Sequence, residues 1–82
     1  METEDIGLRV KVGAVFEKCG IIPKWFVWNG KKIDISNVTH SWKGREGEAV
    51  IIYFSAAGEK NLYELSFNQK TLEWRLEKVC LD

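Results

Sequence analysis

The stretch Pro23–Lys32, PKWFVWNGKK, decides most about the fold of this chain because an Asn-Gly pair at positions 29–30 follows a run of apolar residues. Asn-Gly is favoured in two-residue hairpin turns of type I′, in which both central residues adopt a positive φ. A two-residue loop also sets the register, so Trp28 faces Lys31 and the pairing continues in step on both sides. The pair therefore predicts a β-hairpin centred on residues 29–30.

The same register divides the aromatic side chains of this stretch between two faces. Because side chains alternate along a strand, Phe26 and Trp28 point to one side and Trp25 to the other. The first side continues across the hairpin with Ile33, whereas Trp25 shares its side with Lys32. We expect Phe26 and Trp28 in the core and Trp25 on the opposite face.

Alternation with a period of two predicts strands before and after this hairpin. The first is expected over residues 8–16, with Leu8 and Phe16 at the two ends of its apolar face. A further strand is expected to carry Val38, His40 and Trp42 on one face.

The second half of the chain reads as a meander of three strands at 48–55, 61–67 and 72–79. A two-residue type II′ turn at Gly58-Glu59 and a loop at 68–71 would join them. Folding at these turns gives rows of large apolar residues on one face. The rows are Val50–Phe67–Leu72, Ile52–Leu65–Trp74 and Phe54–Tyr63–Leu76. The opposite face would be partly solvated and would pair Glu64 with Arg75.

No helical spacing of apolar residues appears along the chain, so we expect an all-β fold. Six or seven short antiparallel strands in 82 residues are typical of a small barrel or roll of the SH3-like or OB-like kind. Length and composition predict a single domain over residues 1–82, in which residues 1–6 form a disordered acidic leader.

A net charge of zero conceals a marked asymmetry along the chain. Residues 1–8 carry a net charge of −3, residues 9–45 carry +6 and residues 46–82 carry −3. An anionic partner would therefore meet the middle of the chain.

Two cysteines, Cys19 and Cys80, are too few for a disulfide scaffold and have no zinc-ligand spacing. We expect free thiols in the reducing cytoplasm, with no metal or other cofactor. The N-terminus is acidic and resembles no targeting segment. The longest apolar run, residues 49–54, is too short to cross a bilayer, so no membrane partner is expected.

No catalytic signature is present in the sequence. His40 is the only histidine, and the adjacent Ser41 would point to the other face of a strand. The glycines at 44 and 47 lack the spacing of a phosphate-binding loop. We expect a structural or surface role for His40 and no enzymatic activity.

Trp25 is the sharpest candidate for a functional residue, and it has two interpretations. An exposed indole beside Lys32 would resemble the combination of aromatic and cationic side chains in single-strand nucleic-acid binders. Alternatively, the stem of Lys32 lies across the ring, or another strand covers it, and Trp25 is structural.

The order of residues from Pro23 to Val38 fits the pattern P-x-x-F-x-W-x-G-[KR]-x-[YI]-x-[IV]-x-x-V, followed later by Tyr63-x-Leu65 and Trp74-x-Leu76. This order resembles a group of small bacterial proteins of unknown function. The resemblance implies a cytoplasmic bacterial origin and an all-β domain, and it implies no activity or catalytic residue. Ile33 stands where a tyrosine is expected in that group, and the acidic leader has no counterpart there.

Together these features predict a small non-catalytic binding or interaction module whose partner the sequence does not name. The residues proposed for its binding surface are Trp25, Lys24, Lys32, Arg9, Lys11 and Arg45. One alternative is a weak single-stranded nucleic-acid binder that uses the same surface. Another is a homodimer whose interface is an outer aromatic face containing Trp25 and Tyr53.

Overall fold

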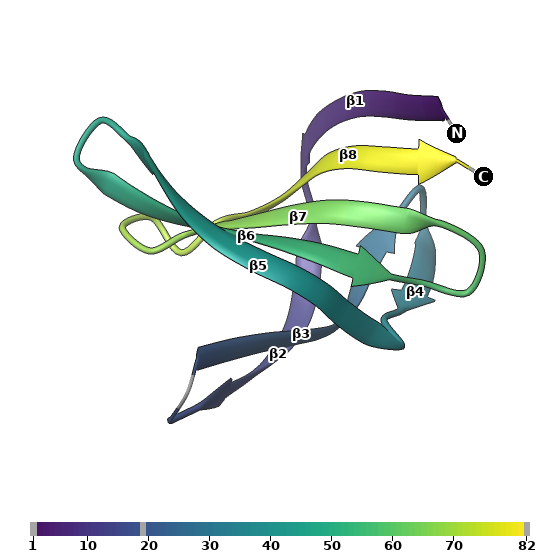
Figure 1. Cartoon of the computed structure of the whole chain (residues 1–82), viewed down its shortest axis with the longest axis horizontal. Helices are drawn as coiled ribbons and strands as arrows, with labels where there is room; N and C mark the ends of the chain where they lie inside the picture. The colour runs from purple at the N-terminus through teal and green to yellow at the C-terminus, as the bar shows by residue number, and fades with distance from the viewer. Residues whose placement is uncertain (1, 19, 82) are drawn as a thin grey trace.

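The computed structural model describes residues 2–18 and 20–81, and these residues form eight β-strands and no helix (Figure 1). The strands are β1 (Glu2–Arg9), β2 (Lys11–Glu17), β3 (Gly20–Trp28), β4 (Lys31–Asp34), β5 (Asn37–Glu46), β6 (Ala49–Ala57), β7 (Leu62–Asn68) and β8 (Trp74–Leu81). The all-β class expected from the sequence is confirmed.

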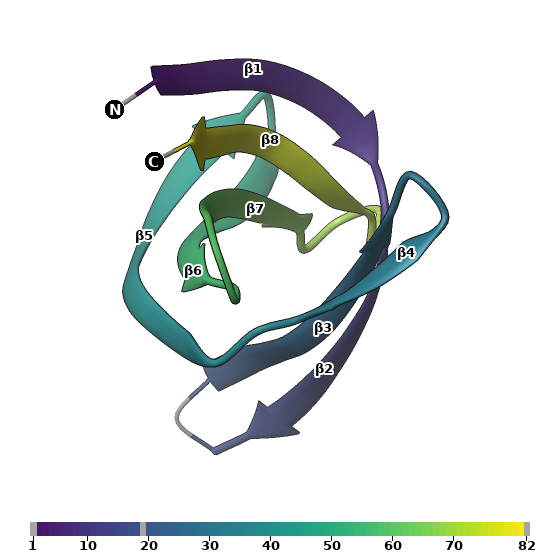
Figure 2. The ribbon, with the colours of Figure 1, turned by 90° about the vertical axis from the view of Figure 1, so that its right-hand side faces the viewer.

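The strands form two antiparallel sheets (Figures 1 and 2). The larger sheet has the order β1-β8-β7-β6-β5, and the smaller sheet has the order β2-β3-β4. In Figure 2 both sheets curve around a common interior. The core cluster contains side chains of both sheets. The sheets do not close into the expected barrel. Within the described residues, each sheet has two edge strands that pair with only one neighbour.

The chain first crosses between the sheets at Val10, which separates β1 from β2. Its amide donates to the carbonyl oxygen of Trp74 at 3.0 Å, so this residue stays attached to the larger sheet. The single strand expected over residues 8–16 is therefore divided between the two sheets. Leu8 and Phe16, at its two ends, are both exposed.

The second crossing lies between β4 and β5. The amide of Ile35 donates to the carbonyl oxygen of Lys24 in β3 at 2.9 Å. The next amide, of Ser36, donates to the carbonyl oxygen of Ala57 in β6 at 2.8 Å. Consecutive amides thus join one sheet and then the other, which fixes the angle between the sheets at this corner.

The hairpin of β3 and β4 confirms the prediction made from Asn29-Gly30. Both turn residues have a positive φ, 53° at Asn29 and 73° at Gly30, as a type I′ turn requires. The observed pairs include Trp28 with Lys31 and run in the predicted register to the end of β4. Phe26 is fully buried, so this face of the hairpin forms part of the core.

The core contains side chains from both sheets. Its buried members are Phe26, Phe54, Ala56, Tyr63, Leu65, Phe67, Leu76 and Val79. Phe26 of the smaller sheet meets Tyr63 of the larger sheet edge-on, with ring centroids 5.0 Å apart. This contact joins the two sheets at the centre of the molecule.

The register between β6 and β7 differs from the predicted register by two residues. Phe54 pairs with Leu65 instead of Tyr63, because the connecting loop has four residues, 58–61. The amide of Gly58 donates to the carbonyl oxygen of Asn61, and Gly58 does not have the positive φ of a type II′ turn. A shift of two keeps the side chains of β6 and β7 on their predicted faces, so Phe54, Leu65 and Phe67 lie in the core although their predicted pairs were wrong.

β8 begins two residues later than expected. Asn68 Oδ1 accepts hydrogen bonds from the amides of Lys70 and Thr71, which folds the loop back on itself. Leu72 follows with φ 64° and is 69% exposed, so it does not belong to the core row predicted for it. The predicted pair of Glu64 with Arg75 is also replaced, since Arg75 lies opposite Ser66.

The structure places residues 2–6 of the expected acidic leader in a strand. Glu2–Arg9 forms strand β1, which pairs antiparallel with β8 from Glu2 opposite Leu81 to Arg9 opposite Arg75. Backbone hydrogen bonding to the edge of β8 explains why this acidic segment is a strand, because the pairing requires no apolar alternation in β1 itself.

Candidate functional site

The outward face of the smaller sheet brings three of the predicted site residues together. Across the strands, Gly13, Trp25 and Asp34 form one row. Lys11 and Lys32 lie in the neighbouring row on either side of β3. Trp25, Lys11 and Lys32 therefore share one surface, as the sequence led us to expect.

The indole of Trp25 is nevertheless half-buried. A Cβ atom on Gly13 would overlap the Trp25 ring, so the ring occupies the space above the backbone of Gly13. The Lys32 ammonium lies 5.4 Å from the ring centroid and 3.7 Å from the carboxylate of Asp34. These contacts correspond to the structural interpretation of Trp25, in which its neighbours cover the ring.

The other predicted site residues are distributed over different parts of the molecule. Lys24 is exposed beside Trp25 at an irregularity in β3. Arg9 lies on β1, where its guanidinium donates to Glu73 at 2.7 Å. Arg45 lies near the turn between β5 and β6, in the larger sheet. The predicted surface is therefore only partly assembled.

A second aromatic surface results from a bulge in β5. Val38 pairs with Ala56, but His40 pairs with Ser55, so Thr39 is an extra residue between them. The bulge reverses the alternation: Val38 packs against the core, while His40 is exposed on the outward face. The expectation that Val38, His40 and Trp42 share one face is therefore wrong for Val38 and holds for the other two.

On this outward face, His40, Trp42 and Tyr53 stack against one another, and we call them the aromatic row. The rings of His40 and Trp42 have centroids 5.4 Å apart and planes at 26°. Trp42 and Tyr53, which face each other across β5 and β6, have centroids 5.4 Å apart and planes at 11°. Trp42 is 37% exposed. Gly44 makes room for the row, since a Cβ there would lie 3.0 Å from the Tyr53 ring.

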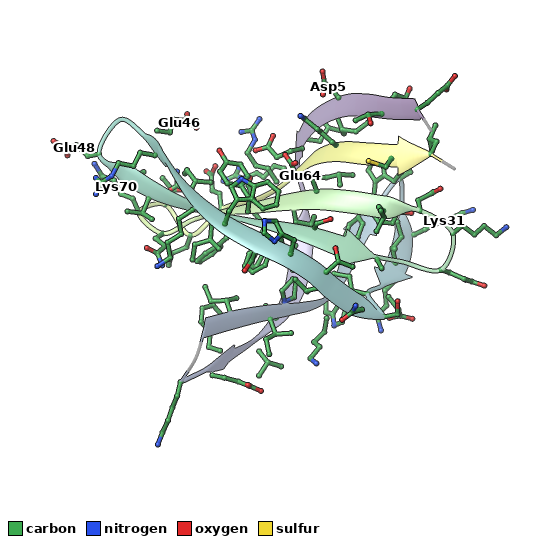
Figure 3. All side chains as sticks on the ribbon, in the orientation of Figure 1. Asp5, Lys31, Glu46, Glu48, Glu64 and Lys70 are labelled. Atoms are coloured by element: carbon green, nitrogen blue, oxygen red, sulfur yellow. The ribbon has the colours of Figure 1, made fainter. Side chains whose placement is uncertain are left out.

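Beside the row lies a shallow hollow of about 400 Å³ in the outward face of the larger sheet. We call it the acidic hollow, and its lining residues are Asp5, Ile6, Gly7, Tyr53, Glu64, Glu77 and Lys78. Figure 3 shows Asp5 and Glu64 on the same side of the molecule. Tyr53 belongs to both features, so the aromatic row and the acidic hollow form one continuous surface.

Two hydrogen bonds hold residues that line the acidic hollow in place. Ser66 is buried, and its hydroxyl donates to Glu77 Oε2 at 2.7 Å. Arg75 donates to the carbonyl oxygen of Gly7 in β1 at 2.7 Å. The first contact orients one carboxylate, and the second holds β1 against β8 at the bulge beside the hollow.

A different cleft, of about 480 Å³, lies between the turn at 29–30 and the loop at 58–61. Trp28 and Tyr63 form its aromatic wall, with ring centroids 6.4 Å apart. The surrounding charges are mixed, with lysines at 31, 32 and 60 and acids at 34 and 59. This cleft has neither the charge excess nor the continuous aromatic surface of the larger sheet.

The chemistry available at these sites is stacking, hydrogen bonding and charge pairing. Across residues 2–18 and 20–81, no three His, Cys, Asp or Glu side chains are grouped so that they could hold a metal ion. Cys80 is a free thiol 3.6 Å from the Thr3 hydroxyl, and Cys19 lies outside the described residues. In that same part of the chain, no helix is long and apolar enough to span a membrane.

Comparison with protein-family models, curated proteins and solved structures finds no match to the chain. The resemblance to small bacterial proteins of unknown function therefore stays a prediction.

Sequence reasoning missed the aromatic row, although one signal was available. Around Trp42, one face of β5 carries Ser41 and Lys43 and the other carries His40 and Gly44, so neither face has a regular apolar series. A lone tryptophan in such a strand has no core to enter, which indicates an exposed position.

Proposed function

We propose that this protein is a small non-catalytic interaction module that binds a segment of another protein across the outward face of its larger sheet. The observation that carries the proposal is the stacked aromatic row, in which His40 and Trp42 are exposed and Tyr53 is partly buried. The polar positions beside it supply hydrogen-bonding groups at the rim of the same face.

Physical chemistry favours binding as the role of this row. Exposed large aromatic residues that adjoin one another mark protein contacts more often than isolated ones do. Stacking also restricts the rings before a partner arrives, so less conformational entropy is lost on binding. Trp25 on the smaller sheet is half-buried and its ring lies over Gly13, so it offers less aromatic surface to a partner.

The fold supports the same role. We propose a roll related to SH3-like and OB-like domains, supported by the two corners at which the chain passes between the sheets. We also propose that the protein works in the cytoplasm, a location that its low cysteine content supports.

The proposal is tested by selecting a random heptapeptide library on the immobilised full-length protein. The selected peptides should bind the wild-type protein and lose at least about tenfold in affinity for Trp42→Ala, because a stacking residue is removed. Leu72→Ala is the matched control, since Leu72 is also an exposed large apolar residue but lies outside the row. The absence of binders, or binders equally sensitive to both variants, would refute the proposal.

A second candidate function is weak binding of single-stranded nucleic acid on the smaller sheet. It is favoured by Lys11 and Lys24, which form no ion pair within the described part of the chain. Titration with a single-stranded oligonucleotide would then quench tryptophan fluorescence at low salt and much less at high salt. No quenching at low salt would exclude it.

The homodimer is the third candidate, and its original interface needs revision. Trp25 and Tyr53 lie on different sheets and do not form one surface. The dimer interface that we propose in its place is the aromatic row. Light scattering at two protein concentrations measures whether such a dimer forms.

A further inference from the structure

We propose that the partner of this surface is an arginine-containing extended peptide, with one arginine on the aromatic row and another in the acidic hollow. This inference rests on the proposed function, because it assigns a ligand chemistry to the same surface.

Charge is the first argument for a cationic ligand. Three carboxylates, those of Asp5, Glu64 and Glu77, line the acidic hollow against one ammonium group, that of Lys78. Within the described residues, neither Asp5 nor Glu64 is in an ion pair with any side chain. A cation that enters the hollow would therefore gain partners that the protein itself does not satisfy.

The two arginines near the hollow are held by contacts within the protein, and only Arg9 is paired with a carboxylate. Arg75 donates to the backbone of Gly7, and Arg9 donates to Glu73. Glu77 keeps one oxygen free after accepting a hydrogen bond from Ser66. The acidic hollow is thus complementary to an added positive charge.

The aromatic row selects arginine among the cations. A guanidinium group is planar, is weakly hydrated and stacks on the faces of aromatic rings, whereas an ammonium group is compact and strongly hydrated. The rings of Trp42 and Tyr53 are nearly parallel, so a planar group can extend their stack. The same guanidinium geometry suits bidentate pairing with a carboxylate in the hollow.

Distance sets the spacing of the two arginines. The row lies on β5 and β6, and the hollow reaches β7, β8 and β1. Adjacent strands are about 4.8 Å apart, so the centres of the two features are roughly 10–14 Å apart. In an extended peptide, residues four apart are separated by about 13 Å and point to the same side. Arginines at positions i and i+4 therefore fit the surface.

The experiment measures fluorescence anisotropy of a labelled heptapeptide with arginine at positions two and six and glycine or serine elsewhere. Its twins carry citrulline, lysine or glutamate at those two positions. We expect the arginine peptide to bind the full-length protein and the citrulline twin, which has the same shape but no charge, to bind roughly tenfold more weakly. The lysine twin should fall between them, and the glutamate twin should not bind.

Variants of the protein then locate the peptide. Trp42→Ala and Glu64→Gln should each weaken binding of the arginine peptide by roughly tenfold or more. Glu48→Gln is the matched control, because Glu48 lies at the far turn of β5 and β6 in Figure 3. It should leave the affinity unchanged. Circular dichroism of each variant confirms that the fold is retained.

The outcomes separate this inference from the proposed function. Equal affinity for the arginine and citrulline peptides, or no effect of Glu64→Gln, would overturn the inference. If library-selected peptides still depended on Trp42, the proposed function would survive with a different ligand. A failure of both peptide sets would refute both proposals. A multimer that Trp42→Ala converts to a monomer would assign the surface to a second copy of the chain and also overturn the inference.

Discussion

Two glycines decide how aromatic side chains are placed on the surfaces of this protein. Gly13 lies under the indole of Trp25, and Gly44 lies beside the ring of Tyr53. In each case the missing side chain provides the space that a neighbouring ring occupies. The two rings make different contacts. The Trp25 ring lies over the backbone of Gly13, whereas the Tyr53 ring stacks against Trp42.

Replacing Gly13 with valine should destabilise the protein by about 1–3 kcal/mol, because the new side chain and the Trp25 ring compete for one space. Urea unfolding measures the loss, and near-ultraviolet circular dichroism should show that an indole has moved. Lys11→Val adds the same side chain to the same strand and face without a ring above it. An equal loss in both variants would mean that Trp25 does not lie over Gly13.

Bulges in the strands determine which side chains reach the core. In β5 the extra residue Thr39 separates the inward Val38 from the outward His40. In β8 an irregularity after Leu76 allows Val79 to be buried as well, although the two positions differ in parity. Simple alternation predicts neither result, because a bulge adds one residue to one strand and leaves no mark in the apolar pattern.

The bulge in β5 predicts unequal effects on stability of two similar substitutions. Val38→Ala should lower the free energy of unfolding by roughly 1–2 kcal/mol, because a side chain packed against the core loses two methyl groups. His40→Ala should change it by less than about 0.5 kcal/mol, since the ring is on the surface. Denaturant titration of both variants measures the difference. A larger loss at His40 would show that the alternation is not reversed.

At the scale of the whole molecule, β1 completes the larger sheet and covers the edge of β8. Val79 and Leu76 in β8 are fully buried, and both pair with residues of β1. β1 also places Asp5 in the lining of the acidic hollow. One strand thus serves both the stability of the sheet and the proposed binding surface.

Deleting residues 1–5 should destabilise the protein by roughly 1–4 kcal/mol, because four cross-strand pairs with β8 are lost. Amide hydrogen exchange should quicken over residues 78–81. A full-length chain with Glu2→Gln and Glu4→Gln separates the loss of pairing from the loss of charge. An unchanged unfolding free energy after the deletion would instead indicate the disordered leader that composition alone suggests.

Much of the fold was accessible from local patterns. Asn29-Gly30 determined a turn and its register, because the positive φ values that it requires leave few alternatives. Alternation placed Phe54, Leu65 and Phe67 in the core even where the predicted pairs were displaced by two. A displacement by two preserves the face of every side chain, so this part of the prediction was insensitive to the error.

By itself, the sequence determined the all-β class, the β3–β4 hairpin and most of the buried side chains, because these depend on turn chemistry and on a two-residue period. Only the tertiary structure decided the division of residues 8–16 between two sheets, the pairing of β1 with β8 and the exposure of Trp42. The reason is physical: corners, edge pairing and bulges depend on contacts between residues far apart in the chain. The aromatic row and the acidic hollow exist only where those distant strands meet.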